Sequence, residues 1–251
     1  MLFDLPHILI LLFSAIAIAV SLILLCKFVK TEEKKNLVLK IFAVLTVVIH
    51  ISSLWVSYFT DGTPEVDTSI LIPTYPCHIS MWLLMILAFK KNKKDLTFKI
   101  LSEITFYLGT IGGVFGIVLN FSYAGNPNLG DWNVLQGFLS HDTLIAGSLY
   151  LLFGSYMKIR VNNMIGIVSG LLGIGVYGWA MIGLHYAFGI SSPNCMALLE
   201  PIYPSMPWIN PYTISGVAIV VLFAFTVIYE YFALKPNERW YNNLKKTKLK
   251  N

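Results

Sequence analysis

The segment ILILLFSAIAIAVSLILLCK, which runs from Ile8 to Lys27, carries no charged side chain before its final lysine. A helix of about 20 apolar residues, rising about 1.5 Å per residue, spans the hydrocarbon core of a bilayer. No lysine or arginine precedes the segment, whereas a cleaved signal peptide begins with a basic region. We therefore interpret it as a membrane anchor whose N-terminus lies outside, and this assigns the chain to the integral membrane proteins.

The composition of the whole chain agrees with this class. Of its 251 residues, 56% are hydrophobic and 12% are charged, and the mean hydropathy is +0.69. Soluble domains are about 25% charged. We predict an all-α polytopic membrane protein, with a bundle of seven transmembrane helices over residues 1–234 and a basic cytoplasmic tail over 235–251. The expected spans cover about 7–29, 38–60, 74–90, 100–122, 134–157, 163–188 and 212–234.

The basic residues predict the orientation of these spans. All 18 lysines and arginines lie within residues 27–40, 90–99, 158–160 and 235–250. They therefore flank the first, third and fifth connections and fill the tail, and none lies before the first span or in the other connections. Because cytoplasmic loops carry the excess of Lys and Arg, we expect the N-terminus outside and the C-terminus in the cytoplasm, which requires an odd number of spans.

The same residues exclude one function class and suggest a location. The net charge of +5 does not predict a nucleic-acid partner, because the basic residues fill gaps between apolar runs and do not form one surface patch. The excess of 16 lysines over 2 arginines is typical of a low-GC bacterium. We expect a multi-pass protein of the cell membrane, here a bacterial plasma membrane.

Six ionisable or thiol side chains inside or at the edge of the spans point to a functional site. They are His50, Cys77, His78, His141, Asp142 and His185. Counted at about 1.5 Å per residue, all except His50 lie within about 12 Å of the outer surface. Such groups are costly in hydrocarbon and are functional candidates by default. We predict that they surround one polar cavity in the outer-leaflet half of the bundle.

Four other ionisable residues have simpler interpretations. Glu103 and Glu230 each lie about one turn inside a lysine-rich cytoplasmic edge, so we expect structural contacts with those lysines. Asp4 and His7 precede the first span at the outer surface, where polar side chains need no special explanation.

Glycines at GxxxG spacing recur inside the spans. The pairs are Gly109 with Gly113, Gly112 with Gly116, and Gly166 with Gly170. This spacing lets two helices approach closely, either between two copies of the chain or within one bundle. We favour packing within one bundle, because glycine is common in membrane helices.

The stretch Pro73-Thr-Tyr-Pro-Cys-His-Ile-Ser80 places a thiol beside an imidazole at the start of the third span. A thiolate is a nucleophile, and a nearby imidazole can take its proton and later return it. A disulfide from Cys77 to Cys195 is the competing interpretation, since both are assigned to the outer side and Cys26 to the inner edge. Adjacent residues on a helix point about 100° apart. We therefore expect Cys77 and His78 to contact different partners, and the same holds for His141 and Asp142.

The sequence predicts neither a metal site nor a cofactor. None of the histidines inside the spans, His50, His78, His141 and His185, has the i, i+3 or i, i+4 spacing to another metal ligand, and the chain contains no CxxC motif.

Two of these segments resemble a known family. Tyr75-Pro76-Cys77-His78-Ile79-Ser80 at a helix start, with Phe138-Leu139-Ser140-His141 in a later span, resembles the YwaF-like bacterial membrane proteins. Those proteins are related to an animal transmembrane family that includes an acyltransferase making ether phospholipids with polyunsaturated chains. The resemblance implies seven spans, with Cys77 as an acyl-accepting nucleophile and His141 as its base.

Three hypotheses follow. The first is a lipid acyltransferase or hydrolase that acts on membrane lipids, with a phospholipid or acyl-chain substrate, Cys77 as nucleophile, His141 as base, and His78 or Asp142 orienting the base. We assign substrate contacts to His185, His50 and Asn120. The second is a transport or binding protein whose polar outer-leaflet cavity holds a small solute, a proton or a lipid, with Asp142 and His185 as ligands. The third is a structural membrane protein whose polar groups only fix helix packing.

Overall fold

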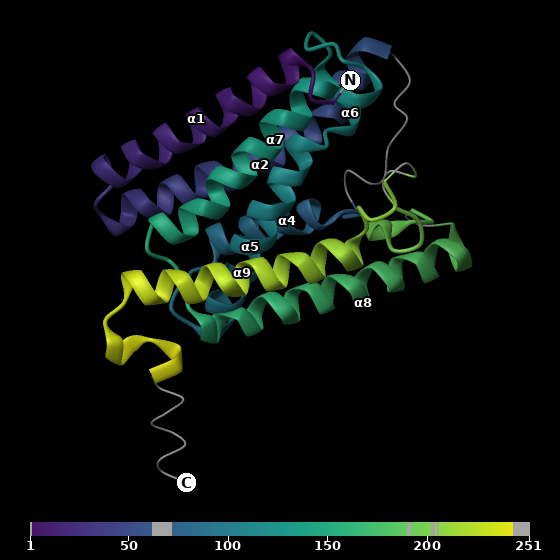
Figure 1. Ribbon diagram of the computed structural model, residues 1–251. Helices are drawn as coiled ribbons and strands as arrows, with labels where there is room; N and C mark the ends of the chain where they lie inside the picture. Colours follow the sequence, from purple (N-terminus) through teal and green to yellow (C-terminus); the bar gives the residue numbers. More distant parts are fainter. Residues whose placement is uncertain (1, 62–71, 190–191, 202–203, 205, 243–251) are drawn as a thin grey trace. The chain divides into compact units, whose positions relative to one another are not determined.

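The computed structural model describes residues 2–61, 72–189, 192–201, 204 and 206–242, and the chain divides into two units, residues 1–156 and 157–251. All regular structure of the described residues is helical (Figure 1). The first unit contains α1 (Leu5–Phe28), α2 (Glu32–Asp61), α4 (Pro76–Phe89), α5 (Leu96–Val118), α6 (Phe121–Gly125) and α7 (Trp132–Phe153). The second contains η1 (Val161–Asn163), α8 (Met164–Phe188), η2 (Cys195–Ala197), α9 (Pro211–Ala233) and η3 (Pro236–Glu238).

Five helical segments of the described chain are long and apolar enough to cross a bilayer. They are Leu5–Phe28, Glu32–Val56, Leu96–Gly125, Val161–Phe188 and Pro211–Ala233. The other two expected spans also form helices. However, α4 has only 14 residues, about 21 Å of helix against about 30 Å of hydrocarbon, and α7 carries polar side chains. The all-helical membrane fold is confirmed, whereas the count of seven spans and their orientation stay predictions.

Helix α7 is the centre of the first unit, because α1, α2, α4 and α5 all pack against it (Figure 1). Its sequence mixes polar and apolar residues along its length. Leu144, Ser148 and Tyr150, for example, are at most 2% exposed. Because neighbouring helices cover it, α7 can carry ionisable side chains inside a membrane without presenting them to lipid.

Glycines on α5 allow α7 to approach closely. A β-carbon at Gly109 would overlap the hydroxyl of Ser148, and a β-carbon at Gly113 would overlap the side chain of Ile145. Small residues at a helix interface permit such contacts in membranes. The Gly109–Gly113 pair therefore serves packing within the bundle, as we expected from the sequence.

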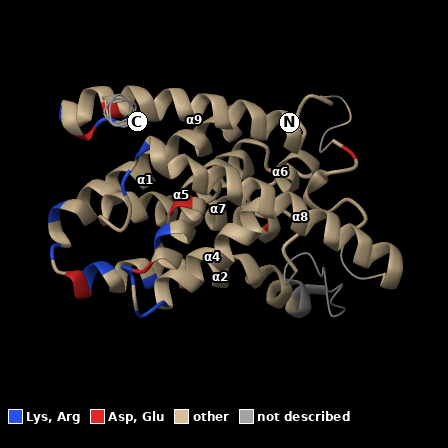
Figure 2. Cartoon of the chain, turned by 90° about the horizontal axis from the view of Figure 1, so that it is seen from below, with Lys and Arg blue, Asp and Glu red and all other residues tan. Residues whose placement is uncertain are grey.

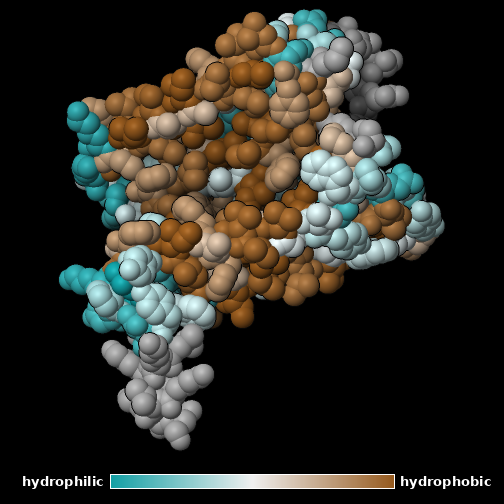
Figure 3. Space-filling model, viewed as in Figure 1, coloured by the Kyte–Doolittle hydropathy of each residue, from teal (hydrophilic) through white to brown (hydrophobic). Residues whose placement is uncertain are grey.

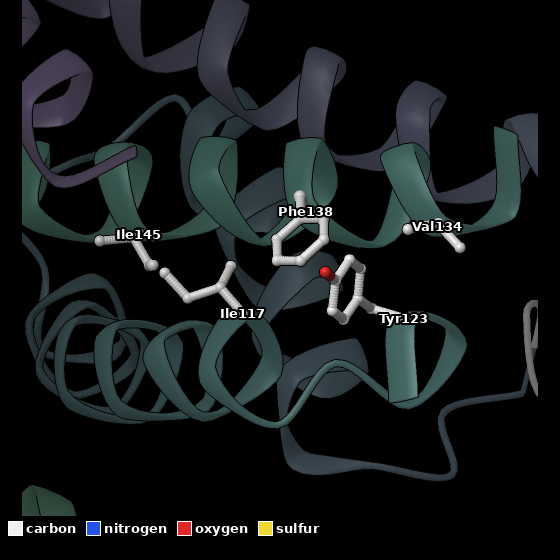
Figure 4. Close-up of a cluster of buried hydrophobic side chains, with 5 residues drawn as sticks. All are labelled: Ile117, Tyr123, Val134, Phe138 and Ile145. Carbon is white, nitrogen blue, oxygen red and sulfur yellow. The ribbon is translucent and has the colours of Figure 1, made fainter. Parts of the chain in front are cut away.

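An apolar cluster beside this contact joins α5 and α6 to α7 (Figure 4). Its members are Ile117, Tyr123, Val134, Phe138 and Ile145, each at most 7% exposed. Leu11 and Ile18 of α1 pack on the same cluster. In a bilayer such packing replaces lipid contacts, so the fit between side chains, and not the exclusion of water, holds these helices together.

Hydrogen bonds fix the N-terminus to α5 and α6. Asp4 accepts from the N–H of His7 (3.1 Å) and from the hydroxyl of Tyr123 (2.6 Å), and the Tyr123 hydroxyl lowers the pKa of Asp4 to about 2. Nε2 of His7 lies 3.1 Å from the carbonyl oxygen of Ile117. His7 is 0% exposed. The expectation that these two residues lie at the surface without a specific role is wrong for His7, because its ring is enclosed between three helices.

The lysines of the first unit gather at one end of its helices (Figure 2). Lys40, near the start of α2, lies over the ring of Phe89 at the end of α4, and the distance to the ring centre is 5.4 Å. Lys93 lies 5.6 Å from the ring of Phe98 at the start of α5. The start of α4, the end of α5 and the N-terminus of α1 therefore lie at the opposite end of the unit.

Apolar side chains cover the visible faces of α1 and α9 (Figure 3). Phe13 on α1 is 73% exposed, and Val220 and Phe232 on α9 are 68% and 81% exposed. Soluble proteins rarely expose large contiguous apolar patches. Lipid chains, and not water, are the solvent that suits these faces.

In the second unit Glu230 joins three segments through backbone amides. One carboxylate oxygen accepts from the N–H of Val161 in η1, and the other accepts from the N–H of Trp240 beyond α9, both at 2.8 Å. Glu230 is 2% exposed. We expected a structural role through lysines, and the structure instead gives Glu230 a structural role through these two amides.

We predict that Glu230→Gln destabilises the protein, because one of the two amide N–H groups would then face the NH2 group of the new side chain. A buried donor without an acceptor costs about 1–3 kcal/mol. The control is Glu238→Gln, which removes the same charge from an exposed position of the second unit. Thermal unfolding in detergent should show a lower Tm for the Glu230 variant alone, and equal Tm values would contradict this role.

Candidate functional site

Cys77 and His78 lie at the start of α4 and meet different neighbours. A β-carbon at Gly112 of α5 would lie 3.5 Å from the β-carbon of Cys77, so Cys77 packs on α5. The ring of His78 lies 4.5 Å from that of His50 on α2 and 5.4 Å from that of Tyr75, measured between ring centres. As the helical spacing predicted, the thiol and its neighbouring imidazole contact different helices, Cys77 lying against α5 and His78 against His50 on α2.

His141 on α7 is held in one tautomer by the backbone. Its Nδ1 lies 2.6 Å from the carbonyl oxygen of Gly137, one turn earlier. Because a carbonyl oxygen only accepts, Nδ1 carries the proton, and Nε2 of the neutral ring keeps its lone pair. This Nε2 is buried and has no hydrogen-bond partner in the part of the chain that the structure describes. A buried lone pair of this kind suits a general base.

Two glycines of α5 bring Cys77 and His141 onto one face of that helix. Gly112 contacts Cys77, and the imidazole of His141 lies on Gly116, where any β-carbon would overlap the ring. Positions four residues apart on a helix are about 5–6 Å apart at their β-carbons. The predicted nucleophile and the predicted base therefore lie one helical turn apart along α5, at the end of the unit that is far from its lysines.

Asp142 points away from this site. Its Oδ2 accepts a hydrogen bond from the hydroxyl of Ser14 on α1 (2.8 Å), and its Oδ1 is buried without a partner among the described residues. The predicted divergence of His141 and Asp142 is confirmed. The orienting contact that we expected from Asp142 or His78 is supplied by the carbonyl of Gly137, because that oxygen is already within hydrogen-bond distance of Nδ1.

Asn120 belongs to the same site. It caps the short helix α6 by accepting at Oδ1 from the N–H of Tyr123 (3.0 Å), and it is 4% exposed. A β-carbon at Gly137 would lie 2.9 Å from Nδ2 of Asn120, so the amide lies against the residue whose carbonyl orients His141. Nδ2 has no hydrogen-bond partner within the described ranges.

An aromatic contact connects the start of α4 to the start of α6 beside the site. The rings of Tyr75, just before α4, and Phe121, the first residue of α6, are stacked with 6.4 Å between their centres. This stacking joins the segment that carries Cys77 to the segment that carries Asn120. The site therefore lies among four elements: the starts of α4 and α6, and the sides of α5 and α7 that face each other. The contacts at Gly112, Gly116 and Gly137 connect these elements.

His50 and His185, the other two residues assigned to substrate contacts, have different neighbours from Asn120. His50 is 8% exposed and pairs with His78, and its carbonyl accepts from the side chain of Gln136 (3.0 Å). This pair lies on the α2 side of α4. His185 lies on α8 of the second unit, where its ring is 5.7 Å from that of Tyr186.

Two other kinds of site, a disulfide and a metal site, can also be compared with the structure. Cys77 is a free thiol, so the structure contains no disulfide from it to Cys195. Among the described residues no group of three His, Cys, Asp or Glu side chains is arranged to hold a metal ion.

Several residues of the site were not identified from the sequence. Gly112 and Gly116 were interpreted only as a packing motif, and Gly137 and Ser14 were not singled out. The sequence does contain one signal for Gly137. It precedes His141 by four residues, and a polar side chain on a helix can form a hydrogen bond with the carbonyl four residues earlier.

Comparisons with known proteins identify one family. The family model described as the TMEM164 family matches residues 2–229. No curated protein and no solved structure matches the chain.

We predict that Gly116→Ala perturbs the protein and Gly112→Ala does not. The β-carbon at position 116 would overlap the imidazole of His141, whereas at position 112 it would lie 3.5 Å from Cys77, an ordinary contact. Overpacking of this kind costs about 1–3 kcal/mol. Both changes replace glycine by alanine in the same helix, so the gain in helix propensity is shared. Thermal unfolding in detergent should separate the two variants, and equal Tm values would contradict the placement of His141.

Proposed function

Because the chain belongs to the TMEM164 family, whose model spans residues 2–229, we propose that it is a membrane-embedded enzyme that transfers or hydrolyses lipid acyl chains. Cys77 is the nucleophile and His141 is the base. The observation that carries this proposal is the tautomer of His141, whose unprotonated Nε2 lies on the same face of α5 as Cys77. The resemblance of the Cys77 and His141 segments to proteins related to a lipid acyltransferase supports it.

The proposed reaction has two halves. In the first, Nε2 of His141 takes the proton of the Cys77 thiol, the thiolate attacks the carbonyl carbon of a lipid ester, and a carbon–sulfur bond forms. The ester carbon–oxygen bond breaks, and the leaving oxygen receives the proton from the imidazolium. In the second half an acceptor hydroxyl gives its proton to His141 and attacks the thioester. The carbon–sulfur bond breaks and Cys77 regains its proton. Water as acceptor gives hydrolysis, and a lipid hydroxyl gives transfer.

The carbonyl of Gly137 has a defined task in this scheme. It keeps the proton on Nδ1, so Nε2 can act as a base toward the thiol, and it stabilises the imidazolium that forms by accepting from its N–H. General-base catalysis of this kind contributes about 10²- to 10⁴-fold to a rate. The substrate class that fits is a membrane phospholipid, because the site lies within apolar helices.

We predict that an alkyne-tagged acyl chain of a phospholipid in vesicles labels Cys77 as a thioester. Cys77→Ala should abolish the labelling, and His141→Ala should slow it by about 10²-fold or more, because general-base catalysis contributes about 10²- to 10⁴-fold to a rate. Gel fluorescence after click chemistry measures the labelling, and sensitivity to neutral hydroxylamine identifies a thioester.

Cys26→Ala is the matched control, since Cys26 lies at the lysine-rich end of the unit and should not affect labelling. Undiminished labelling of Cys77→Ala would rule out the nucleophile. In cells, lipid profiles of wild type and His141→Ala should differ in the acyl chains of their phospholipids, and this comparison identifies the substrate.

We also propose that α1, α2, α4, α5, α7, α8 and α9 all span the cell membrane, with the N-terminus outside and the site in the outer-leaflet half. The alternation of the basic segments supports this topology. The gathering of the first unit's lysines at one end agrees with it (Figure 2).

We predict that a green fluorescent protein fused after Lys94 fluoresces and that an alkaline phosphatase fused there is inactive. Residue 94 lies in the cytoplasm if α4 crosses the bilayer and outside if this 14-residue helix does not. The reverse pattern of reporter activity would exclude the seven-span topology. A fusion after residue 251 is the control, because its cytoplasmic position is the same for five spans and for seven.

A further inference from the structure

We propose that the side-chain amide of Asn120 donates the hydrogen bond that stabilises the oxyanion formed when Cys77 attacks an acyl ester. This inference rests on the proposed function. It assigns a third catalytic group, whose role is separate from those of the nucleophile and the base.

The orientation of the Asn120 amide is set by its capping contact. Oδ1 accepts from the N–H of Tyr123, so the other end of the amide, Nδ2, carries the two hydrogens that remain available. Asn120 is 4% exposed, and Nδ2 has no hydrogen-bond partner in the portion of the chain that is described. A buried donor without an acceptor destabilises a fold, so a bound oxygen atom would satisfy a group that the free protein leaves unpaired.

The position of this donor suits an acyl carbonyl. Nδ2 lies against Gly137, whose own carbonyl holds Nδ1 of His141. The Tyr75–Phe121 stacking joins the start of α6, where Asn120 lies, to the start of α4, which carries Cys77. The donor Asn120 at the start of α6, the base His141 on α7 and the nucleophile Cys77 on α4 thus come from three neighbouring elements. Acyl transfer requires these three groups close together.

The fold holds Asn120 rigidly. Tyr123 of the same short helix donates its hydroxyl to Asp4, and its ring stacks on that of His7 with 5.0 Å between ring centres. Nε2 of His7 donates in turn to the carbonyl of Ile117 on α5, since its Nδ1 accepts from the N–H of Phe3. A donor that is fixed before the reaction requires no reorganisation when the negative charge develops, and this is the condition for strong electrostatic catalysis.

The chemical step is balanced without any further reactant. As the sulfur of Cys77 bonds to the carbonyl carbon, the π electron pair of the carbonyl moves to its oxygen, which becomes negative and accepts the N–H of Asn120. When this electron pair re-forms the carbonyl double bond, the ester carbon–oxygen bond breaks, and the leaving oxygen takes its proton from His141. The same donor serves the second half of the reaction, in which the thioester carbonyl passes through an equivalent oxyanion.

The competing explanation is that Asn120 only caps α6. Two substitutions separate the roles, because Asp and Ser are both good N-caps but neither carries the amide donor. The test uses the full chain in phospholipid vesicles. It compares acylation of Cys77 by the alkyne-tagged phospholipid with alkylation of Cys77 by iodoacetamide, which displaces iodide and forms no oxyanion. Peptide mass spectrometry measures both rates, and Asn210→Ser, a change at the N-cap of α9 in the second unit, is the matched control.

We expect Asn120→Asp and Asn120→Ser to slow acylation by about 10²- to 10³-fold, as the loss of one oxyanion donor does, while the rate of alkylation and the Tm stay unchanged. The Asn210→Ser control should leave both rates unchanged. Undiminished acylation, or equal falls in acylation and alkylation, would overturn the donor role and leave the Cys77–His141 mechanism intact. If Cys77 of the wild type is not acylated at all, the proposed function fails and the role of Asn120 fails with it.

Discussion

The first unit depends on how closely α5 approaches α7 and α4. Ser148 and Ile145 occupy the space where side chains at Gly109 and Gly113 would lie, and the imidazole of His141 occupies the space at Gly116. In a bilayer no water is expelled when helices associate, so close backbone packing must supply the stabilisation. The absence of β-carbons on one face of α5 therefore both holds the bundle together and creates the space in which His141 lies.

Polarity inside the membrane is the second constraint, and the unit meets it by placing α7, which carries polar side chains along its length, at its centre. Helix α7 carries His141 and Asp142 on adjacent residues; the carbonyl of Gly137 on α7 itself holds the imidazole, and Ser14 of α1 donates to the carboxylate. The apolar helices α1 and α9 present their side chains outward. Neighbouring helices cover the polar side chains of α7, and length and hydropathy alone do not identify this helix as a candidate span.

Sequence patterns predicted the helices better than they predicted the contacts between them. Within the described residues a helix lies at each of the seven expected spans, because a bilayer demands helices of a minimum length. The structure places Cys77 and His141 against glycines of α5 and Asn120 against Gly137 of α7, and the roles of these three residues stay predictions. The roles of Gly116 and Gly137 could not be read from spacing, since a GxxxG motif has the same appearance whether a backbone or an imidazole lies on it. His7 was misjudged because its depth was counted from the start of an apolar run, whereas Asp4 and Tyr123 draw the start of α1 against α5.

The way His141 is oriented follows from the cost of charge in a low dielectric. A carboxylate beside an imidazole would hold the tautomer, but a buried carboxylate carries a large desolvation penalty that only a full partner offsets. The carbonyl of Gly137 holds the same proton with a neutral dipole that already exists in the helix, so the tautomer is fixed without adding a buried charge. The carboxylate of Asp142 instead accepts a hydrogen bond from Ser14 on α1. The neighbouring carboxylate and imidazole thus have different hydrogen-bond partners, and the proton on Nδ1 of His141 is held by the backbone and not by Asp142.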